Sequence, residues 1–272
     1  MRKIISIFIL FIFLHSCSSD PKKVEVETII PKTEELVATI NYDVIGKFPH
    51  DLTAFTEGLL FHNNQLFEST GAPADQEQYK TMIGILDTLK GKLDPKINIG
   101  RDFFGEGIVI FNDKIYQLTY KNQVGYVYNA TTYKQISKFS YSNKEGWGMT
   151  TDGINLIMSD GTNILTYLDP NTLKPTKTLN VTNAGYAEDN INELEYIDGF
   201  IYANIWMKNY IIKIDTKTGK TVGVMDCSHI TDEAHRLNPE SDVLNGIAYD
   251  PATKRMFITG KMFPNVYVIK LR

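Results

Sequence analysis

The sequence predicts an all-β fold, a five-bladed β-propeller, and the prediction rests first on a repeated phrase. A polar or aromatic residue, then Gly or Glu, then a mostly apolar run recurs five times in the 272 residues. The first residues of the five copies are Glu57, Glu106, Trp147, Asn192 and Asn245. The steps between them are 49, 41, 45 and 53 residues, and self-similarity at such a period indicates a repeat architecture.

The second observation is that each unit contains the same series of short strands. In the second unit apolar and polar residues alternate, and Asn, Asp or Gly separate the runs, which is the signal of strands and hairpins. The expected strands of this unit are 107–111, 115–120, 124–128 and 135–139. Four antiparallel strands in about 45 residues match the size of one propeller blade.

The third observation is how the repeat begins and ends. The fifth unit has only three expected strands, at 246–249, 256–259 and 266–270. A surplus strand, expected over 36–42, precedes the first unit. If this N-terminal strand completes the last blade, the ring closes without a free edge. Few segments have helical periodicity, and the best candidate for a helical turn is 231–237.

Residues 1–16 have the features of a secretory signal peptide. A basic start precedes an apolar run, Ile4–Leu14, that is too short to span a membrane as a helix. The segment Leu-His-Ser-Cys that ends at Cys17 resembles the lipobox of bacterial lipoproteins, in which that cysteine becomes the lipidated N-terminus. The alternative is an ordinary signal peptide that a cysteine follows by chance.

The signal peptide sets the expected domain organisation and location. Residues 17–35, the lipidated Cys17 and a polar stretch with Pro, are expected to form a flexible tether, and 36–272 the propeller domain. We expect a lipoprotein of the bacterial cell envelope, on the periplasmic side or in the outer membrane, that contacts the membrane only through its lipid anchor.

Composition excludes several classes of partner and cofactor. Loss of Arg2 and Lys3 with the signal peptide takes the formal charge from −4 to −6, which argues against nucleic acid. The sequence has no Gly-rich phosphate loop, HExxH or CxxC, so neither a cofactor nor a metal is expected. Lipidation of Cys17 would leave Cys227 alone, as a buried small residue rather than a nucleophile. Nothing indicates an oligomer, and we expect a monomer.

The repeated phrase also predicts a site. The first strand of each propeller blade lines the central channel, so the five first residues should converge near one mouth. A second set follows 14 to 16 residues later, and an antiparallel hairpin returns to the same end of its blade. This second set is Tyr120, Trp206 and Lys261, and Phe55 and Phe104 extend the aromatic wall. Two carboxylates, two amides and one ammonium meet there, and buried charged groups are costly enough to be candidates for function.

Eight phrases, in the same order from about residue 45 to the C-terminus, resemble the plant- and bacterial-type glutaminyl-peptide cyclotransferases. They are Phe55-Thr-Glu-Gly, Phe104-Gly-Glu-Gly, Gln117-Leu-Thr-Tyr-Lys-Asn, Gly146-Trp-Gly-Met-Thr-Thr-Asp-Gly, Asn192-Glu-Leu-Glu-Tyr, Ala203-Asn-Ile-Trp, Val243-Leu-Asn-Gly-Ile-Ala-Tyr-Asp and Thr259-Gly-Lys. The resemblance implies a five-bladed propeller. It also implies that peptides or proteins with an N-terminal glutamine are converted to pyroglutamate with release of ammonia, without a metal.

The chain departs from the family at three positions. Tyr120 stands where the family commonly has Trp, Glu57 where it commonly has Gln, and Phe263 where Trp is common. Tyr120 changes the width of the expected pocket, and Glu57 adds a charge near the substrate amine. Both bear on rate and substrate preference more than on the type of reaction.

Each site residue has an expected role in this reaction. Glu106, in the phrase that matches the family best, is expected to move the proton, and Lys261 and Asn192 to hydrogen-bond the oxyanion. Glu57 is expected to bind the substrate's α-ammonium. The other substrate-binding residues are Trp147, Trp206, Tyr120, Phe104, Phe55 and Asn245.

Two other functions stay open from the residues alone. Two Glu and two Asn around an axis suit Ca²⁺, as in a lactonase-like hydrolase, although an ammonium at the same level would compete with the cation. A propeller that only binds a partner is the other alternative, and it has no need of a pocket with carboxylates and an ammonium.

Overall fold

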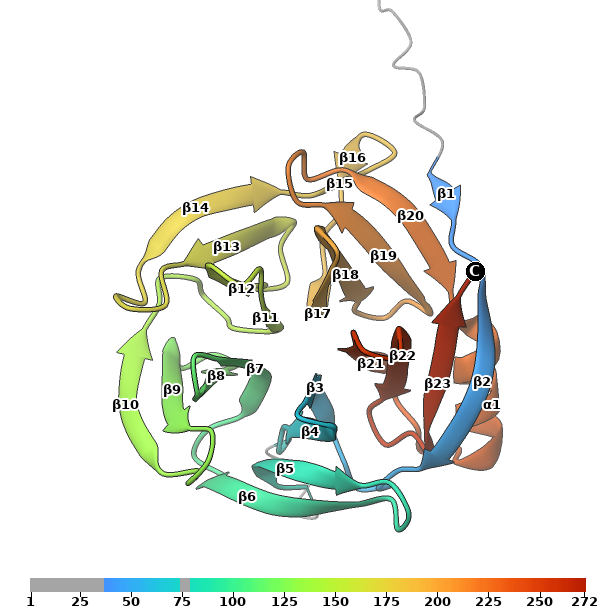
Figure 1. Cartoon of the computed structure of the whole chain (residues 1–272), viewed down its shortest axis with the longest axis horizontal. Coiled ribbons are helices and arrows are strands. Elements are labelled where there is room, and N and C mark those ends of the chain that lie inside the picture. Colours follow the sequence, from blue (N-terminus) through green and yellow to red (C-terminus); the bar gives the residue numbers. More distant parts are fainter. Residues whose placement is uncertain (1–36, 74–78) are drawn as a thin grey trace, which may run out of the picture. The chain divides into compact units, whose positions relative to one another are not determined.

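The structure, a computed structural model, describes residues 37–73 and 79–272. Within them five β-sheets surround one axis, which confirms the predicted propeller (Figure 1). The predicted signal peptide, the lipidated Cys17 and the tether over 17–35 lie outside the described residues. Within the described ranges no helix is long and apolar enough to cross a membrane.

The first three blades follow one another along the chain. Blade 1 comprises β3 (Thr56–His62), β4 (Gln65–Thr70), β5 (Thr81–Asp87) and β6 (Lys92–Gly100). Blade 2 comprises β7 (Gly105–Phe111), β8 (Lys114–Thr119), β9 (Val124–Asn129) and β10 (Gln135–Ser140). Blade 3 comprises β11 (Met149–Thr151), β12 (Leu156–Met158), β13 (Ile164–Leu168) and β14 (Pro175–Asn180). In each blade the first strand lies nearest the axis (Figure 1).

The last two blades include strands from the N-terminal side. Blade 4 comprises β17 (Ile191–Ile197), β18 (Phe200–Ile205), β19 (Tyr210–Asp215) and β20 (Thr221–Asp226), with β1 (Ala38–Thr39) along its outer edge. Blade 5 comprises β21 (Leu244–Asp250), β22 (Arg255–Gly260), β23 (Asn265–Leu271) and β2 (Tyr42–Pro49). A small hairpin of β15 (Thr182–Asn183) and β16 (Tyr186–Ala187) precedes blade 4.

An N-terminal strand completes the last blade, as predicted, but it is not the segment 36–42. The closing strand is β2, which pairs antiparallel with β23 from Tyr42 to Pro49, whereas β1 pairs parallel with β20 of blade 4. The Gly and Pro in 43–49 obscured this strand in the sequence. The ladder shifts register between Val44 and Gly46, and Pro49 ends the strand, so both residues take positions that a strand tolerates.

The predicted helical turn at 231–237 is a longer helix, α1 (Ser228–Leu237), beside blade 5 (Figure 1). It buries Ile230 and Ala234 against the core between blades 4 and 5. Cys227, just before α1, is a free cysteine in that core. Burial raises the pKa of its thiol to about 12, which agrees with a packing role rather than a nucleophilic one.

The hydrophobic core lies between neighbouring blades. Each of the larger clusters in the described residues combines side chains from two adjacent blades. At the ring closure Leu59 and Leu66 of blade 1 pack with Ala248 and Val266 of blade 5. Each blade therefore buries its faces only when both neighbours are in place.

The innermost strands approach one another backbone to backbone around the axis. A Cβ atom on Gly107 would lie 2.5 Å from Trp147 O, and the Gly107 N–H donates to that oxygen at 2.7 Å. This close approach explains why Gly follows the first residue in four copies of the repeated phrase. Glu193 occupies that position in blade 4, and its carboxylate accepts hydrogen bonds from Leu59 N at 3.3 Å and Ile247 N at 2.9 Å.

Candidate functional site

A cavity of about 340 Å³ lies where the first strands begin. Its walls are Phe55, Glu57, Pro73, Phe104, Glu106, Tyr120, Trp147, Asn192, Trp206, Asp242 and Lys261. This set includes nine of the ten cavity residues that the repeated phrase and its hairpins predicted. We call this space the ring cavity.

The repeat positions and the hairpins bring these residues together. Glu57, Glu106 and Asn192 are each the second residue of the innermost strand of a blade, and Trp147 lies two residues before β11. The hairpin prediction is also correct, because Tyr120, Trp206 and Lys261 each directly follow the second strand of a blade.

Asn245 is the one predicted cavity residue that does not line the ring cavity. It is fully buried beneath Glu57, and its Nδ2 donates to Thr56 O at 3.0 Å and to Glu57 Oε2 at 3.4 Å. Asn245, the first residue of the fifth copy, therefore orients the carboxylate of Glu57, the first residue of the first copy, rather than facing the cavity.

Glu57 and Lys261 form a buried ion pair across the ring closure. Lys261 Nζ donates to Glu57 Oε1 at 2.7 Å, and the ammonium lies 4.5 Å from the centroid of the Phe55 ring. Burial raises the pKa of Glu57 to about 7, although the Lys261 ammonium acts in the opposite direction. Lys261 thus favours the charged form of a carboxyl group that burial makes weakly acidic.

The surroundings of Glu106 favour the protonated form of its carboxyl group. Burial raises its pKa well above the ordinary range, and the nearby Glu57 carboxylate adds to the shift. Since Lys261 pairs with Glu57, the arrangement favours an anionic Glu57 beside a protonated Glu106. A carboxyl group with a raised pKa can donate a proton and accept one in turn during a reaction.

Two groups of aromatic rings enclose these carboxyl groups. Phe104 lies between Phe55 and Tyr120, with ring centroids 6.0 Å and 5.8 Å away. Trp147 and Trp206 meet edge to face, with centroids 6.0 Å apart. Flat apolar walls around a few polar groups are typical of small-molecule sites.

Asn192 contributes an amide oxygen that the protein leaves without a partner. The side chain is buried, and Asn192 Oδ1 has no hydrogen-bond partner among the described residues. A buried polar atom without a partner is costly. Because Asn192 lines the cavity, its Oδ1 is placed to accept a hydrogen bond from a bound molecule.

Two wall residues were missed by the sequence reasoning, Pro73 and Asp242. Asp242 N donates to Lys261 O at 2.9 Å, and the Asp242 charge contributes to the raised pKa of Glu57. Asp242 precedes the fifth phrase in a connection that has no equivalent in the other units. Comparison of the repeats could not identify it for that reason.

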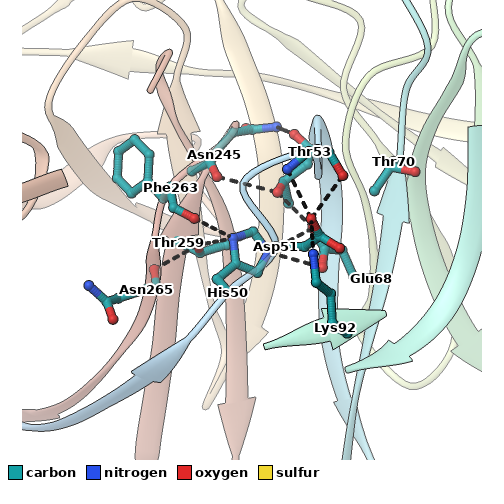
Figure 2. Close-up of polar contacts among 12 residues, drawn as sticks. His50, Asp51, Thr53, Glu68, Thr70, Lys92, Asn245, Thr259, Phe263 and Asn265 are labelled. Carbon is teal, nitrogen blue, oxygen red and sulfur yellow. Dashed lines mark hydrogen bonds and ion pairs between the residues drawn. The ribbon is translucent and has the colours of Figure 1, made fainter. Parts of the chain in front are cut away.

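A second buried ion pair lies behind the ring cavity, between His50 and Glu68 (Figure 2). His50 Nε2 lies 3.1 Å from both Glu68 oxygens, and Nδ1 donates to Phe263 O at 2.8 Å. Thr56, next to Glu57 in the chain, donates from Oγ1 to Glu68 Oε1 at 2.7 Å. The pair therefore connects the end of β2 with blades 1 and 5.

The environment of His50 favours its charged form. Burial lowers its pKa, but the Glu68 carboxylate and the hydrogen bond to Phe263 O outweigh burial, so the net pKa is raised. Both ring nitrogens face oxygen acceptors, which also fits a doubly protonated ring.

No group of three or more His, Cys, Asp and Glu side chains in residues 37–73 and 79–272 is arranged to hold a metal ion. In the ring cavity, Lys261 Nζ already contacts Glu57, one of the three carboxyl groups in the wall, with Glu106 and Asp242. The Glu57 carboxylate is therefore arranged around the ammonium of Lys261.

Comparisons with known proteins identify the family of this chain. A family model described as glutamine cyclotransferase matches residues 9–271. A glutaminyl-peptide cyclotransferase of Arabidopsis thaliana is 36% identical over 232 residues, which cover 85% of this chain and 71% of that protein. The crystal structure of Myxococcus xanthus glutaminyl cyclase superposes with a TM-score of 0.79 at 32% identity, over 87% of this chain and 98% of that one. The chain therefore belongs to the glutamine cyclotransferase family and is an enzyme of that type.

Proposed function

We propose that this enzyme converts the N-terminal glutamine of peptides and proteins to pyroglutamate in the ring cavity, with release of ammonia. The observation that carries the assignment is an aromatic cavity that places the buried carboxyl group of Glu106 beside the Glu57–Lys261 ion pair. The name of the Arabidopsis relative, a cyclotransferase of glutaminyl peptides, supports the substrate class.

Holding the substrate in a folded conformation is the first task of the cavity. The α-amine attacks the γ-carboxamide carbon of the same residue, so the reaction needs only that the two groups be held close together. Trp147, Trp206 and Tyr120 clamp the glutamine side chain and exclude water. The Glu57 carboxylate receives the α-ammonium on arrival.

Glu106 moves the proton. The α-amine has an ordinary pKa of about 8, so its neutral form is accessible near neutral pH. As the new C–N bond forms and the carboxamide C–N bond breaks, Glu106 gives its proton to the departing NH₂ group and takes one from the attacking nitrogen. The C–N bond of the carboxamide breaks, ammonia leaves, and Glu106 ends in the protonation state in which it began.

Lys261 and Asn192 stabilise the intermediate. The carboxamide oxygen becomes negatively charged when the amine attacks. The Lys261 ammonium and the Asn192 amide then donate hydrogen bonds to it, an arrangement of the oxyanion-hole type. Because Lys261 already contacts Glu57, the ammonium is held in place before the substrate arrives.

The test of this function is the release of ammonia from a Gln-initiated dipeptide by the purified protein, in excess chelator. We expect ammonia release with a product lighter by one ammonia, and no loss of rate in chelator, since no step requires a metal. Activity that depended on Ca²⁺ would instead favour the lactonase-like alternative. A failure to cyclise any Gln-peptide would favour a binding propeller.

We also propose that the protein is a monomeric bacterial lipoprotein, anchored in the cell envelope through Cys17, on the periplasmic side or in the outer membrane. The lipobox-like segment before Cys17 supports this proposal. Radiolabelled palmitate should be incorporated into the wild-type protein in cells and not into Cys17→Ser. Equal labelling of the two proteins would contradict the anchor.

A further inference from the structure

A second cavity, of about 720 Å³, adjoins the ring cavity on the side of blade 3. Its lining comes from the loops 142–145 and 160–162, from β13 and β14, and from Asn190. Trp147 and Trp206 line both cavities. We call this second cavity the blade 3 groove.

Trp147 is held firmly at the boundary between the two spaces. Its Nε1 donates to Glu145 Oε2 at 2.9 Å, and Gly161 lies against its ring so closely that a Cβ there would be 2.7 Å from Cζ2. Glu145 and Gly161 both line the blade 3 groove. The same indole thus forms a fixed wall of the ring cavity and of the groove.

We propose that the blade 3 groove binds the residues that follow the N-terminal glutamine of a peptide substrate. This inference rests on the proposed function, because only a substrate that continues beyond its first residue needs such a site. The ring cavity takes the residue that reacts, and the rest of the peptide can pass over Trp147 and Trp206, which line both spaces, into the groove. The volume of the groove lies within the usual range of small-molecule binding sites, which leaves room for a few peptide residues.

The chemistry of the groove favours contact with a peptide of any charge. The residues from β13 and β14 are neutral, namely Ile164, Thr166, Pro175 and Thr178. The loops contribute Lys144, Glu145 and Asp160, and Glu145 lies 3.6 Å from the ammonium of Lys121. These charges balance.

Asp160 is further occupied by Asn143 Nδ2 at 2.8 Å and by the Thr162 hydroxyl at 2.6 Å. Binding in the groove should therefore depend on peptide length more than on peptide charge.

The test compares a Gln-initiated dipeptide with a Gln-initiated hexapeptide of neutral residues. For the wild type we expect kcat/KM to be about tenfold higher for the hexapeptide, which corresponds to about 1.4 kcal/mol. Thr178 is exposed on β14 and does not line the ring cavity, so Thr178→Trp should fill the groove from the side of β14. In that variant kcat/KM for the hexapeptide should fall to the value for the dipeptide. The value for the dipeptide should stay within about twofold of the wild type.

Ser137→Trp is the matched control, because Ser137 is exposed on β10, the outermost strand of blade 2, outside the groove. This variant should keep the wild-type kcat/KM for both peptides. Equal kcat/KM for the two peptides in the wild type would overturn the inference and leave the proposed function standing. An unchanged ratio of the two kcat/KM values in Thr178→Trp would also overturn it, and so would an equal loss of kcat/KM for both peptides. Absence of turnover of either peptide by the wild type would overturn the proposed function, and this inference with it.

Discussion

Glu106→Gln is expected to lower kcat by about 10²–10⁴-fold, the usual contribution of general acid–base catalysis. The amide has nearly the shape of the carboxyl group, so the substrate should still bind and KM should change little. Without an exchangeable carboxyl proton, the attacking nitrogen and the leaving group lose their proton carrier. Ammonia release at saturating Gln-peptide measures the effect.

The same substitution should not destabilise the protein, which separates lost chemistry from misfolding. A raised pKa in the native state means that stability is lost as the pH rises above the ordinary pKa of the carboxyl group. Glutamine carries no such cost, so the midpoint of thermal unfolding at pH 8 should equal or exceed that of the wild type. Glu240→Gln, at an exposed position, is the control. Wild-type ammonia release from Glu106→Gln would disprove its role.

His50→Leu is expected to cost about 3–5 kcal/mol of unfolding free energy, because it leaves Glu68 buried without its ionic partner. Both side chains are fully inaccessible to solvent, so water cannot replace the lost contact. The Thr56 hydroxyl would remain as a neutral donor to Glu68. Denaturant unfolding at pH 6 measures the loss.

The double variant His50→Leu/Glu68→Met should recover much of this stability, since apolar side chains of similar volume often replace a buried ion pair at little cost. The pH dependence adds a second test. The pKa of His50 is raised in the native state, so its contribution is complete below about 6.5 and is lost as the pH rises through the raised value. Wild type should therefore lose stability more steeply than the double variant above that pH. If the loss of unfolding free energy in the double variant equalled the sum of the losses in the two single variants, the coupling of His50 and Glu68 would be contradicted.

The sequence was sufficient for the ring and for most of the site, because both follow from one repeated position. Glu57 and Glu106 occupy equivalent positions of the repeat, which places them at one mouth of the channel. Antiparallel pairing returns each hairpin to that end of its blade, so Lys261 and Trp206 lie at the same mouth. What the repeat could not predict depends on residues without counterparts in other blades. Asp242 lies in an irregular connection, and the closing strand β2 is interrupted by a bulge.

Two further features depend on contacts across the ring closure, which the repeat does not specify. Asn245 occupies a repeat position, but hydrogen bonds to Thr56 and Glu57 hold its side chain beneath the cavity. The partnership of His50 and Glu68 crosses from β2 to blade 1, and only the closed ring brings these two side chains together. Side-chain pairing across the closure depends on tertiary geometry rather than on local pattern.

The position of the Glu57–Lys261 pair at the ring closure also has a consequence for biosynthesis. The two residues are separated by 204 positions, and Lys261 is followed by only one more strand, β23. A nascent chain that lacks β23 has neither the partner for β2 nor a closed ring. Contacts of such long range form late in folding. We therefore expect a growing or C-terminally shortened chain without β23 to lack the Glu57–Lys261 ion pair, and activity to appear only after β23 has been synthesised.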